Sequence, residues 1–167
     1  TTAAQEIKMV DFDKAFDRLM GHEGGYTPGK GDPGGETKWG ISKRSYPHLD
    51  IQSLTRDGAK VIYRRDFWDR VAIASPALRY QVFDFAVNSG IDTAVRKLQQ
   101  VLGVADDGVW GPVSAAALAR AEESDLLMRF LAARIRFMTR LSTWQLHGAG
   151  WMNRIAGQLD YGAGDTQ

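Results

Sequence analysis

The sequence contains no cysteine, so neither a disulfide framework nor thiol chemistry is available to this protein. A zinc site would need ligands other than thiolates. The chain nevertheless has 167 residues, which is long enough to bury a core that is stable without cross-links. A fold that needs no disulfides is typical of proteins made in a reducing cytoplasm, and we expect synthesis there.

Long apolar runs and an excess of one charge are also lacking. No segment approaches the roughly 18 consecutive apolar residues of a membrane span, so we expect no stable membrane insertion. Residues 1–10 lack the apolar run of an export signal. The 21 Lys and Arg residues nearly balance the 20 Asp and Glu residues, and the net charge of +1 favours no particular partner.

Charge is nevertheless uneven near the C-terminus. Residues 126–159 contain five arginines and no acidic residue. The five are Arg129, Arg134, Arg136, Arg140 and Arg154. Such a stretch is either a solvated helix face or a surface that lies against an anionic cell wall or membrane. No nucleic-acid-binding motif accompanies these arginines, so we expect no nucleic-acid partner.

Hydrophobic periodicity predicts a mainly helical protein, because apolar residues recur at three- and four-residue spacing along most of the chain. The helices expected on this basis cover residues 11–21, 55–68, 76–89, 92–102, 112–121, 124–146 and 151–161. Thr55 and Asp92 are expected to cap the starts of two helices, and Gly103 to end one.

Residues 21–40 interrupt this pattern. They hold eight of the 18 glycines and two of the five prolines. That density excludes a long helix and predicts tight turns or a small β-hairpin near residues 26–42. Loops that follow a rigid helix end often carry functional side chains.

The glycine-rich segment holds carboxylates in two different settings. Burial of Glu23 against the preceding helix would raise its pKa and keep it protonated, as a general acid requires. Asp32 lies in a solvated loop where a carboxylate stays ionised, and the Thr37 hydroxyl can orient a water. Glycoside hydrolysis needs this division of roles. Tyr26 and Trp39 offer flat apolar faces for sugar rings. The alternative interpretation is an ordinary helix end followed by turns.

The remaining polar residues give weaker indications of a catalytic or metal-binding function. On a strand, Glu36 would face away from Thr37, so we interpret it as a surface residue. His22 could tune the pKa of Glu23, but a histidine at a helix end is more often a dipole partner or a packed residue. His48 and His147 are isolated in the sequence, and nothing predicts a metal site or a cofactor.

Two strings carry a resemblance to a known family. Residues 23–26 read Glu-Gly-Gly-Tyr, and residues 32–42 read Asp-Pro-Gly-Gly-Glu-Thr-Lys-Trp-Gly-Ile-Ser. They resemble the N-terminal signature of glycoside hydrolase family 108, N-acetylmuramidases found among phage endolysins and bacterial secretion-activator proteins. Further similar segments are residues 62–68, 83–90, 98–112 and 150–155. The third of these resembles a peptidoglycan-binding region, and the whole resemblance spans roughly residues 10–157.

The resemblance implies a mainly α, lysozyme-like fold. We expect a catalytic lobe at residues 1–90 and a helical lobe at residues 91–167, together forming one compact unit. It also implies hydrolysis of the β-1,4 bond between N-acetylmuramic acid and N-acetylglucosamine. Glu23 would be the acid, and Asp32 with Thr37 would hold the water. The Asp–Thr spacing is one residue shorter than in the broader phage-type lysozyme group. Asn88 resembles a position that binds the sugar N-acetyl group; a helix cap is its alternative.

The resemblance also implies where and how the protein acts. We expect a monomer without cofactor that is made in the bacterial cytoplasm and cuts peptidoglycan glycan strands in the periplasm after release. Two other functions fit the same residues. A lytic transglycosylase would use Glu23 alone and leave anhydromuramic ends, and Asp32 with Thr37 argues against it. A non-catalytic peptidoglycan-binding protein would use the segment 98–112 and have no need of Glu23.

Overall fold

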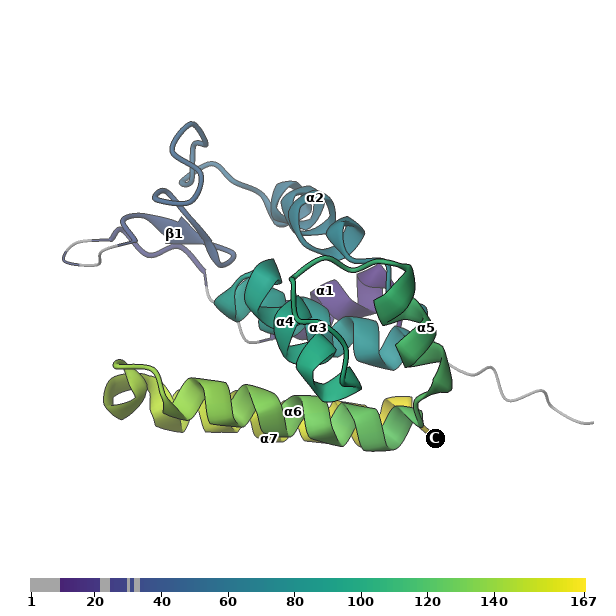
Figure 1. Ribbon diagram of the computed structural model, residues 1–167. Coiled ribbons are helices and arrows are strands. Elements are labelled where there is room, and N and C mark those ends of the chain that lie inside the picture. The colour runs from purple at the N-terminus through teal and green to yellow at the C-terminus, as the bar shows by residue number, and fades with distance from the viewer. Residues whose placement is uncertain (1–9, 22–24, 30, 32–33) are drawn as a thin grey trace, which may run out of the picture. The chain divides into compact units, whose positions relative to one another are not determined.

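The computed structural model describes residues 10–21, 25–29, 31 and 34–167. The described chain is mainly helical with one small antiparallel sheet (Figure 1). This confirms the predicted fold class, a mainly α, lysozyme-like fold with a β element near residues 26–42. Within the described chain, no helix combines the length and the apolar character needed to cross a membrane.

The chain divides into two compact units. We call Phe12–Arg70 the hairpin unit; Val71–Gln167, with Val10 and Asp11, form the helical unit. The expected lobes met at residue 90, whereas the compact units meet at residue 70, so the helix at 76–89 belongs with the later helices. The assignment of catalysis to one lobe and of wall binding to the other stays a prediction.

The hairpin unit contains two helices and a two-stranded sheet. These are α1 (Phe12–Met20), β1 (Thr37–Lys38), β2 (Ile41–Ser42), α2 (Arg56–Asp66) and a 3-10 turn (Trp68–Arg70). The apolar residues of α1 recur at helical spacing, and the side chains so aligned are buried. They pack against α2 and the 3-10 turn: the Phe16 ring lies 6.0 Å from that of Tyr63, and the Phe12 ring 5.7 Å from that of Trp68.

Thr55 caps α2 as predicted, because its hydroxyl accepts the Gly58 N–H at 3.0 Å. The helix is shorter than expected. It ends at Asp66, and the chain tightens into the 3-10 turn that buries Trp68.

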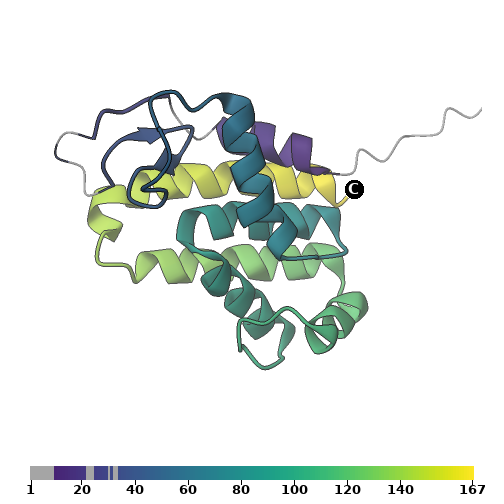
Figure 2. The same ribbon diagram turned by 90° about the horizontal axis from the view of Figure 1, so that it is seen from above.

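The helical unit is built around one buried helix. Its elements are α3 (Pro76–Ser89), α4 (Ile91–Leu102), α5 (Pro112–Arg120), α6 (Glu123–Thr139) and α7 (Trp144–Asp165). α3 is buried over most of its circumference and packs against α4, α6 and α7 (Figure 2). A helix that is buried on several sides lacks a single apolar stripe.

Three predicted helix boundaries in this unit are wrong. Gly90, not Asp92, occupies the N-cap of α4, and Asp92 instead forms an ion pair with Arg96 one turn later. The long helix expected at 124–146 ends at Thr139, and the last helix begins at Trp144 rather than at residue 151. A reversal at residues 140–143 lets α7 pack along α6, and this tertiary contact outweighs the continuous periodicity.

A close contact joins α6 and α7 at Gly162. A Cβ atom on Gly162 would lie 2.7 Å from Cδ2 of Leu127, nearer than real Cβ atoms approach. A side chain at position 162 would therefore require the buried Leu127 side chain to shift. Gly103 ends α4 with a left-handed φ of 71°, as predicted.

A buried ionic triad joins three helices of this unit. The carboxylate of Asp84 on α3 accepts Nη1 of Arg134 on α6 at 2.6 Å and Nη2 of Arg154 on α7 at 2.8 Å. Asp84 and Arg134 are fully buried, and the side chain of Arg154 is 11% exposed. The guanidinium of Arg134 also lies over the Phe85 ring, 4.9 Å from its centre.

This triad corrects the interpretation of the arginine-rich stretch. Arg134 and Arg154 belong to the interior and offer no charge to an anionic surface. Arg129 forms an exposed pair with Asp125 at 2.9 Å, one helical turn away. Arg136 and Arg140 are exposed. The five arginines therefore form neither a single solvated face nor a single binding face.

Burial by itself would raise the pKa of Asp84, but the two guanidinium groups outweigh it and hold that pKa below its ordinary value. Burial lowers the pKa of Arg134, against the attraction of Asp84. Arginine stays protonated in proteins, so the triad carries one negative and two positive charges.

We expect Asp84→Asn to lower the free energy of unfolding by about 3–5 kcal/mol, because it leaves two guanidinium groups without their counter-charge. Asp125→Asn, which breaks only the exposed pair with Arg129, is the matched control and should cost under about 1 kcal/mol. Urea unfolding at neutral pH measures both changes. Equal small losses in the two variants would contradict a structural role for the triad.

The same variant predicts a pH dependence. An aspartate with a lowered pKa in the folded state stabilises the protein above its unfolded pKa, which is about 3.9, and that stabilisation is lost as the pH falls through the folded pKa. The stability difference between the parent and Asp84→Asn should therefore shrink as the pH is lowered below about 4. A difference that stays constant down to full acid unfolding would be incompatible with an ionised Asp84.

Candidate functional site

A tight hairpin follows the glycine-rich segment and includes its last residues. Thr37 pairs with Ser42 and Lys38 with Ile41, which leaves Trp39 and Gly40 as a two-residue turn. Both turn residues have positive φ, 53° for Trp39 and 74° for Gly40, as a type I′ turn requires. Trp39 is the one non-glycine residue with positive φ in the described chain. A bulky side chain in this conformation carries a strain energy.

Two hydrogen bonds hold Trp39 in place. Its indole Nε1 donates to the Leu54 carbonyl at 3.1 Å, and the buried Tyr63 hydroxyl donates to the Trp39 carbonyl at 2.9 Å. Tyr63 lies on α2, so the turn is anchored to that helix. The sequence predicted Trp39 as a platform for a sugar ring and gave no indication of an anchor from Tyr63. The anchoring function was missed, because neither hydrogen bond leaves a signal in the pattern; stacking on sugar stays a prediction.

A second pairing closes the loop that precedes β1. Thr27 and Thr37 exchange backbone hydrogen bonds, with N···O distances of 2.7 and 3.0 Å. Next to this bridge the backbone at Gly29 approaches the backbone at Gly35 closely, and we call this contact the crossing. A Cβ on Gly29 would lie 2.2 Å from the carbonyl carbon of Gly35. Gly29 also has a φ of +70°, so both the space and the backbone demand glycine. The crossing and the bridge define a narrow base for the segment 30–34.

The predicted catalytic residues divide between described and undescribed positions. Glu23 and Asp32 lie outside the described residues, as does His22. Asp32 belongs in sequence to the segment 30–34, whose base is fixed as above. Thr37 is the first residue of β1, and its hydroxyl donates a long hydrogen bond of 3.4 Å to the Gly35 carbonyl. The catalytic functions of all three stay predictions.

Tyr26 and Glu36 come together beside the bridge. The Tyr26 hydroxyl donates to Oε1 of Glu36 at 3.3 Å, and 39% of the tyrosine remains exposed. Desolvation of the phenol raises the pKa of Tyr26, and the Glu36 carboxylate adds to this effect. The phenol of Tyr26 therefore stays neutral, and part of the ring remains exposed. Its proposed contact with a sugar ring stays a prediction.

Asn88 lies in the other unit, on the exposed last turn of α3. Its Oδ1 accepts the Ser89 hydroxyl at 3.4 Å. The C-cap of α3 is Gly90 rather than Asn88, so the capping interpretation of Asn88 is wrong. Sugar binding by Asn88 stays a prediction.

The hairpin unit also contains a mainly apolar cavity of about 360 Å³ between the loop at residues 45–49 and α2. His48 lines it, and Tyr46 borders it through a hydroxyl that donates to Asp66 at 2.8 Å. Burial and this bond raise the pKa of Tyr46 to about 12. No group of three or more His, Asp or Glu side chains in the described chain is placed to hold a metal ion.

Comparison with known proteins finds a matching family model and a similar solved structure. Residues 16–90 match the family model described as Glycosyl hydrolase 108. The fold is similar to the solved structure of SagA from Brucella abortus, with 29% sequence identity and a TM-score of 0.84. The alignment covers 93% of this chain and 95% of SagA. Both comparisons support the assignment to glycoside hydrolase family 108 that the sequence resemblance predicts.

The family 108 assignment confirms the resemblance found in the sequence and supports a glycoside hydrolase. The matched residues begin inside α1 and end at the C-cap of α3, so they include the hairpin, its anchor on α2 and the buried Asp84. No curated protein matches the sequence.

We expect Gly29→Ala to open the base of the segment 30–34, because its Cβ would collide with the Gly35 backbone. Gly31→Ala is the matched control: Gly31 has a similar φ of +86°, but apart from its chain neighbours none of the described heavy atoms lies within 4 Å of its Cβ position. Gly31→Ala should lower the free energy of unfolding only by the conformational strain of the left-handed alanine, about 1–2 kcal/mol. Amide exchange at Thr27 and Thr37 reports the bridge directly. Equal exchange rates in both variants would mean that the crossing does not hold the bridge closed.

We expect Tyr63→Phe to lower the free energy of unfolding by about 1 kcal/mol, because it removes the hydrogen bond to the Trp39 carbonyl and leaves the packing intact. Backbone chemical shifts of Trp39 and Gly40 should change with it as the strained turn relaxes. Thermal unfolding and a heteronuclear spectrum are the two measurements. Unchanged turn resonances would show that Tyr63 does not fix the turn.

Proposed function

We propose that this glycoside hydrolase is a lysozyme that hydrolyses the β-1,4 bond between N-acetylmuramic acid and N-acetylglucosamine in peptidoglycan. The family assignment supports a carbohydrate substrate. The closed base of the segment 30–34, where Thr27 pairs with Thr37 and Gly29 crosses Gly35, carries the proposal further. Thr37 is held by this geometry, and we propose that it acts together with Asp32, which precedes it by five residues in the sequence. We propose that the protein acts as a monomer on glycan strands of the cell wall.

The proposed step needs one proton donor and one positioned water. Glu23 gives its proton to the glycosidic oxygen as the bond from that oxygen to the anomeric carbon breaks. A water attacks the anomeric carbon from the opposite face and loses a proton to Asp32. The products are two shorter strands, one with a new reducing end. This arrangement inverts the anomeric centre and requires the two carboxyl groups to be about 6.5–9.5 Å apart.

Thr37 is suited to hold the attacking water. Its backbone is fixed on both sides, by β2 on one edge and by Thr27 on the other. Its hydroxyl proton points to the Gly35 carbonyl, so its oxygen lone pairs can accept a hydrogen from water. The attacking lone pair of the water is then free for the anomeric carbon. A rigid backbone matters because positioning contributes much of the rate.

We propose that Tyr26, Trp39 and Asn88 contact the sugars. The exposed part of the Tyr26 ring offers a flat apolar surface to a pyranose ring. The exposed Asn88 side chain carries both a donor and an acceptor, which matches an N-acetyl group. Trp39 has its N–H engaged with Leu54, so it would act through its ring face alone.

Mass spectrometry of digested peptidoglycan tests the proposed reaction. Muramic acid at new reducing ends supports hydrolysis of the proposed bond. Anhydromuramic ends would replace the proposal with a lytic transglycosylase, and glucosamine reducing ends would move the cut to the other glycosidic bond. Glycan that stays uncut would instead support the alternative of a non-catalytic peptidoglycan-binding protein.

Glu23→Gln should reduce the rate of peptidoglycan hydrolysis by about 10²–10⁴, because loss of a general acid typically costs this much. Asp32→Asn should cause a comparable loss if it accepts the proton of the water. Glu36→Gln is the matched control, since its carboxylate already binds Tyr26 and is given no part in the step. Near-normal turnover by Asp32→Asn would remove the positioned-water mechanism, and near-normal turnover by Glu23→Gln would remove the proposed acid.

A further inference from the structure

The end of the helical unit at which α6 joins α7 contains no acidic residue of its own. We call residues 136–151 the α6–α7 junction. They comprise the last turn of α6, the reversal and the first two turns of α7 (Figure 1). The nearest acidic residues along these helices are Asp125, roughly 16 Å from Arg136, and Asp160, roughly 13 Å from Trp151. Both distances exceed the Debye length of about 8 Å at physiological salt.

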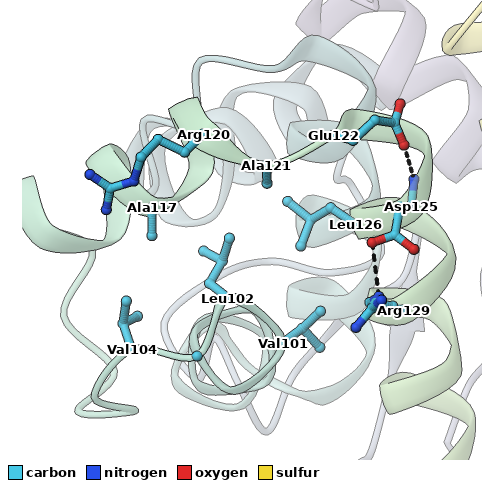
Figure 3. A pocket seen from close by; sticks show the side chains of 11 residues that line it. Val101, Leu102, Val104, Ala117, Arg120, Ala121, Glu122, Asp125, Leu126 and Arg129 are labelled. Atoms are coloured by element: carbon cyan, nitrogen blue, oxygen red, sulfur yellow. Dashed lines mark hydrogen bonds and ion pairs between the residues drawn. The ribbon is translucent and has the colours of Figure 1, made fainter.

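Two exposed arginines lie at this junction. Arg136 is in the last turn of α6, and Arg140 is the C-cap of that helix. Neither forms an ion pair with a carboxylate of the described chain. The other three arginines of the stretch are paired, as Figure 3 shows for Arg129 and Asp125 near the start of α6. The unpaired positive charges of the stretch therefore lie together at one end of the helix pair.

Two tryptophans of the junction pack together on α7. The ring centres of Trp144 and Trp151 lie 6.1 Å apart, and the exposed His147 ring lies 5.7 Å from that of Trp151. The Trp144 ring lies against the helix backbone at Gly148, where a Cβ would be 2.9 Å from two of its carbon atoms. Both indoles are partly exposed. The junction therefore presents aromatic rings at the surface.

The N–H groups of these two indoles differ from those of other tryptophans in the protein. Trp39 and Trp110 donate theirs to backbone carbonyl groups at 3.1 Å. None of the described atoms accepts a hydrogen bond from Trp144 or Trp151. An indole of this kind suits the boundary between water and an apolar phase, because the ring can be buried while the N–H binds a polar headgroup.

Leu146 lies with Trp144 in the first turn of α7. Its side chain is 78% exposed, the largest fraction among the exposed large apolar side chains of the described chain. Residues two positions apart on a helix lie about 200° apart around its axis, so these two side chains project from different sides of the turn. Helical side chains tilt toward the N-terminus, so both tilt toward the junction. A surface that contacts both must therefore meet the end of the helix pair rather than its flank.

This combination fits an anionic lipid bilayer better than a sugar or a soluble polyanion. Guanidinium groups bind the phosphates of lipid headgroups. Tryptophan rings are stabilised at the depth of those headgroups. Leu146 gains free energy only where an apolar phase removes it from water, and neither a glycan strand nor a soluble polyanion supplies one.

We propose that the α6–α7 junction binds to the surface of an anionic lipid bilayer, with the first turn of α7 entering the headgroup region. Two arginines, one leucine and a pair of tryptophans give reversible binding, which agrees with the expectation of no stable membrane insertion. The proposal does not depend on the proposed reaction, because none of the proposed catalytic or sugar-contacting residues belongs to the junction.

Co-sedimentation of the whole protein with vesicles tests the proposal. We expect binding to vesicles of equal parts phosphatidylglycerol and phosphatidylcholine, and little binding to phosphatidylcholine alone. The double variant Arg136→Gln, Arg140→Gln should bind roughly 25-fold more weakly, since each basic residue near an anionic surface contributes a factor of about five. The matched control is Arg120→Gln, Arg129→Gln, which removes the same charge from the region drawn in Figure 3 and should bind nearly as the parent does.

Fluorescence quenching by lipids brominated on their acyl chains tests whether the first turn of α7 enters the bilayer. We expect quenching of the tryptophan emission of the parent and its loss in the variant Trp144→Phe, Trp151→Phe. Leu146→Ser should weaken vesicle binding about tenfold, because it removes an apolar side chain that the bilayer would bury. Val113→Ser, which changes a 70% exposed valine of α5, is the matched control and should bind as the parent does.

Four results would overturn the proposal. The first is equal binding to the anionic and the neutral vesicles. The second is equal affinity of the Arg136→Gln, Arg140→Gln variant and the parent, with both shown to be folded by thermal unfolding. The third is binding of soluble polyphosphate as tightly as vesicles, which would make the junction a site for anionic polymers. The fourth is a change of Trp144 and Trp151 emission on adding N-acetylglucosamine tetramer but none on adding vesicles, which would make it a sugar site.

Discussion

The carboxylate of Asp84 is the one charged group on which the packing of α3, α6 and α7 depends. It contacts an arginine from each of the other two helices, so a shift of any of the three would separate buried charges. Burying this triad is costly, and Nε and Nη2 of Arg134 find no hydrogen-bond partner among the described atoms. Apolar side chains packed at this position would cost less free energy to bury. We infer that the triad is kept because it specifies one alignment of the helices, which a surface of interchangeable aliphatic groups does not.

The hairpin unit uses its backbone in a comparable way. Trp39 adopts a strained φ that is offset by hydrogen bonds to Leu54 and Tyr63, and Gly29 crosses Gly35 at a distance that excludes any side chain. Both features lie within ten residues of Thr37 in the sequence. Strain of this kind persists only where the surroundings determine the conformation more than once. In each unit, therefore, a local energetic cost is linked to a defined geometry.

The sequence predicted those parts of the fold that local rules determine. Helical periodicity located most helices, Thr55 was recognised as a cap from its side chain, and the glycine density located the hairpin. The break between α6 and α7 was missed because periodicity continues across it, and only the packing of α7 along α6 ends the first helix. The burial of Arg134 was missed for a related reason: its partner Asp84 is 50 residues away. In the candidate site, the functions proposed for Glu23 and Asp32 rest on their glycine-rich setting and on the family resemblance and stay predictions. The hydrogen bonds that anchor Trp39 leave no pattern in the sequence.

The crossing of Gly29 and Gly35 has a consequence for how the loop can vary in length. The contact between Gly29 and Gly35 and the Thr27–Thr37 bridge hold the flanking residues together. Residues added between positions 29 and 35 would therefore not alter the register of the hairpin. Their main cost would be loop closure entropy, about 0.6 kcal/mol for each doubling of loop length. A change of length between positions 29 and 35 should therefore alter the free energy of unfolding little, whereas a change outside this interval would disturb the paired residues. The hairpin therefore constrains the spacing between positions 35 and 42 more tightly than it constrains the number of residues between positions 29 and 35.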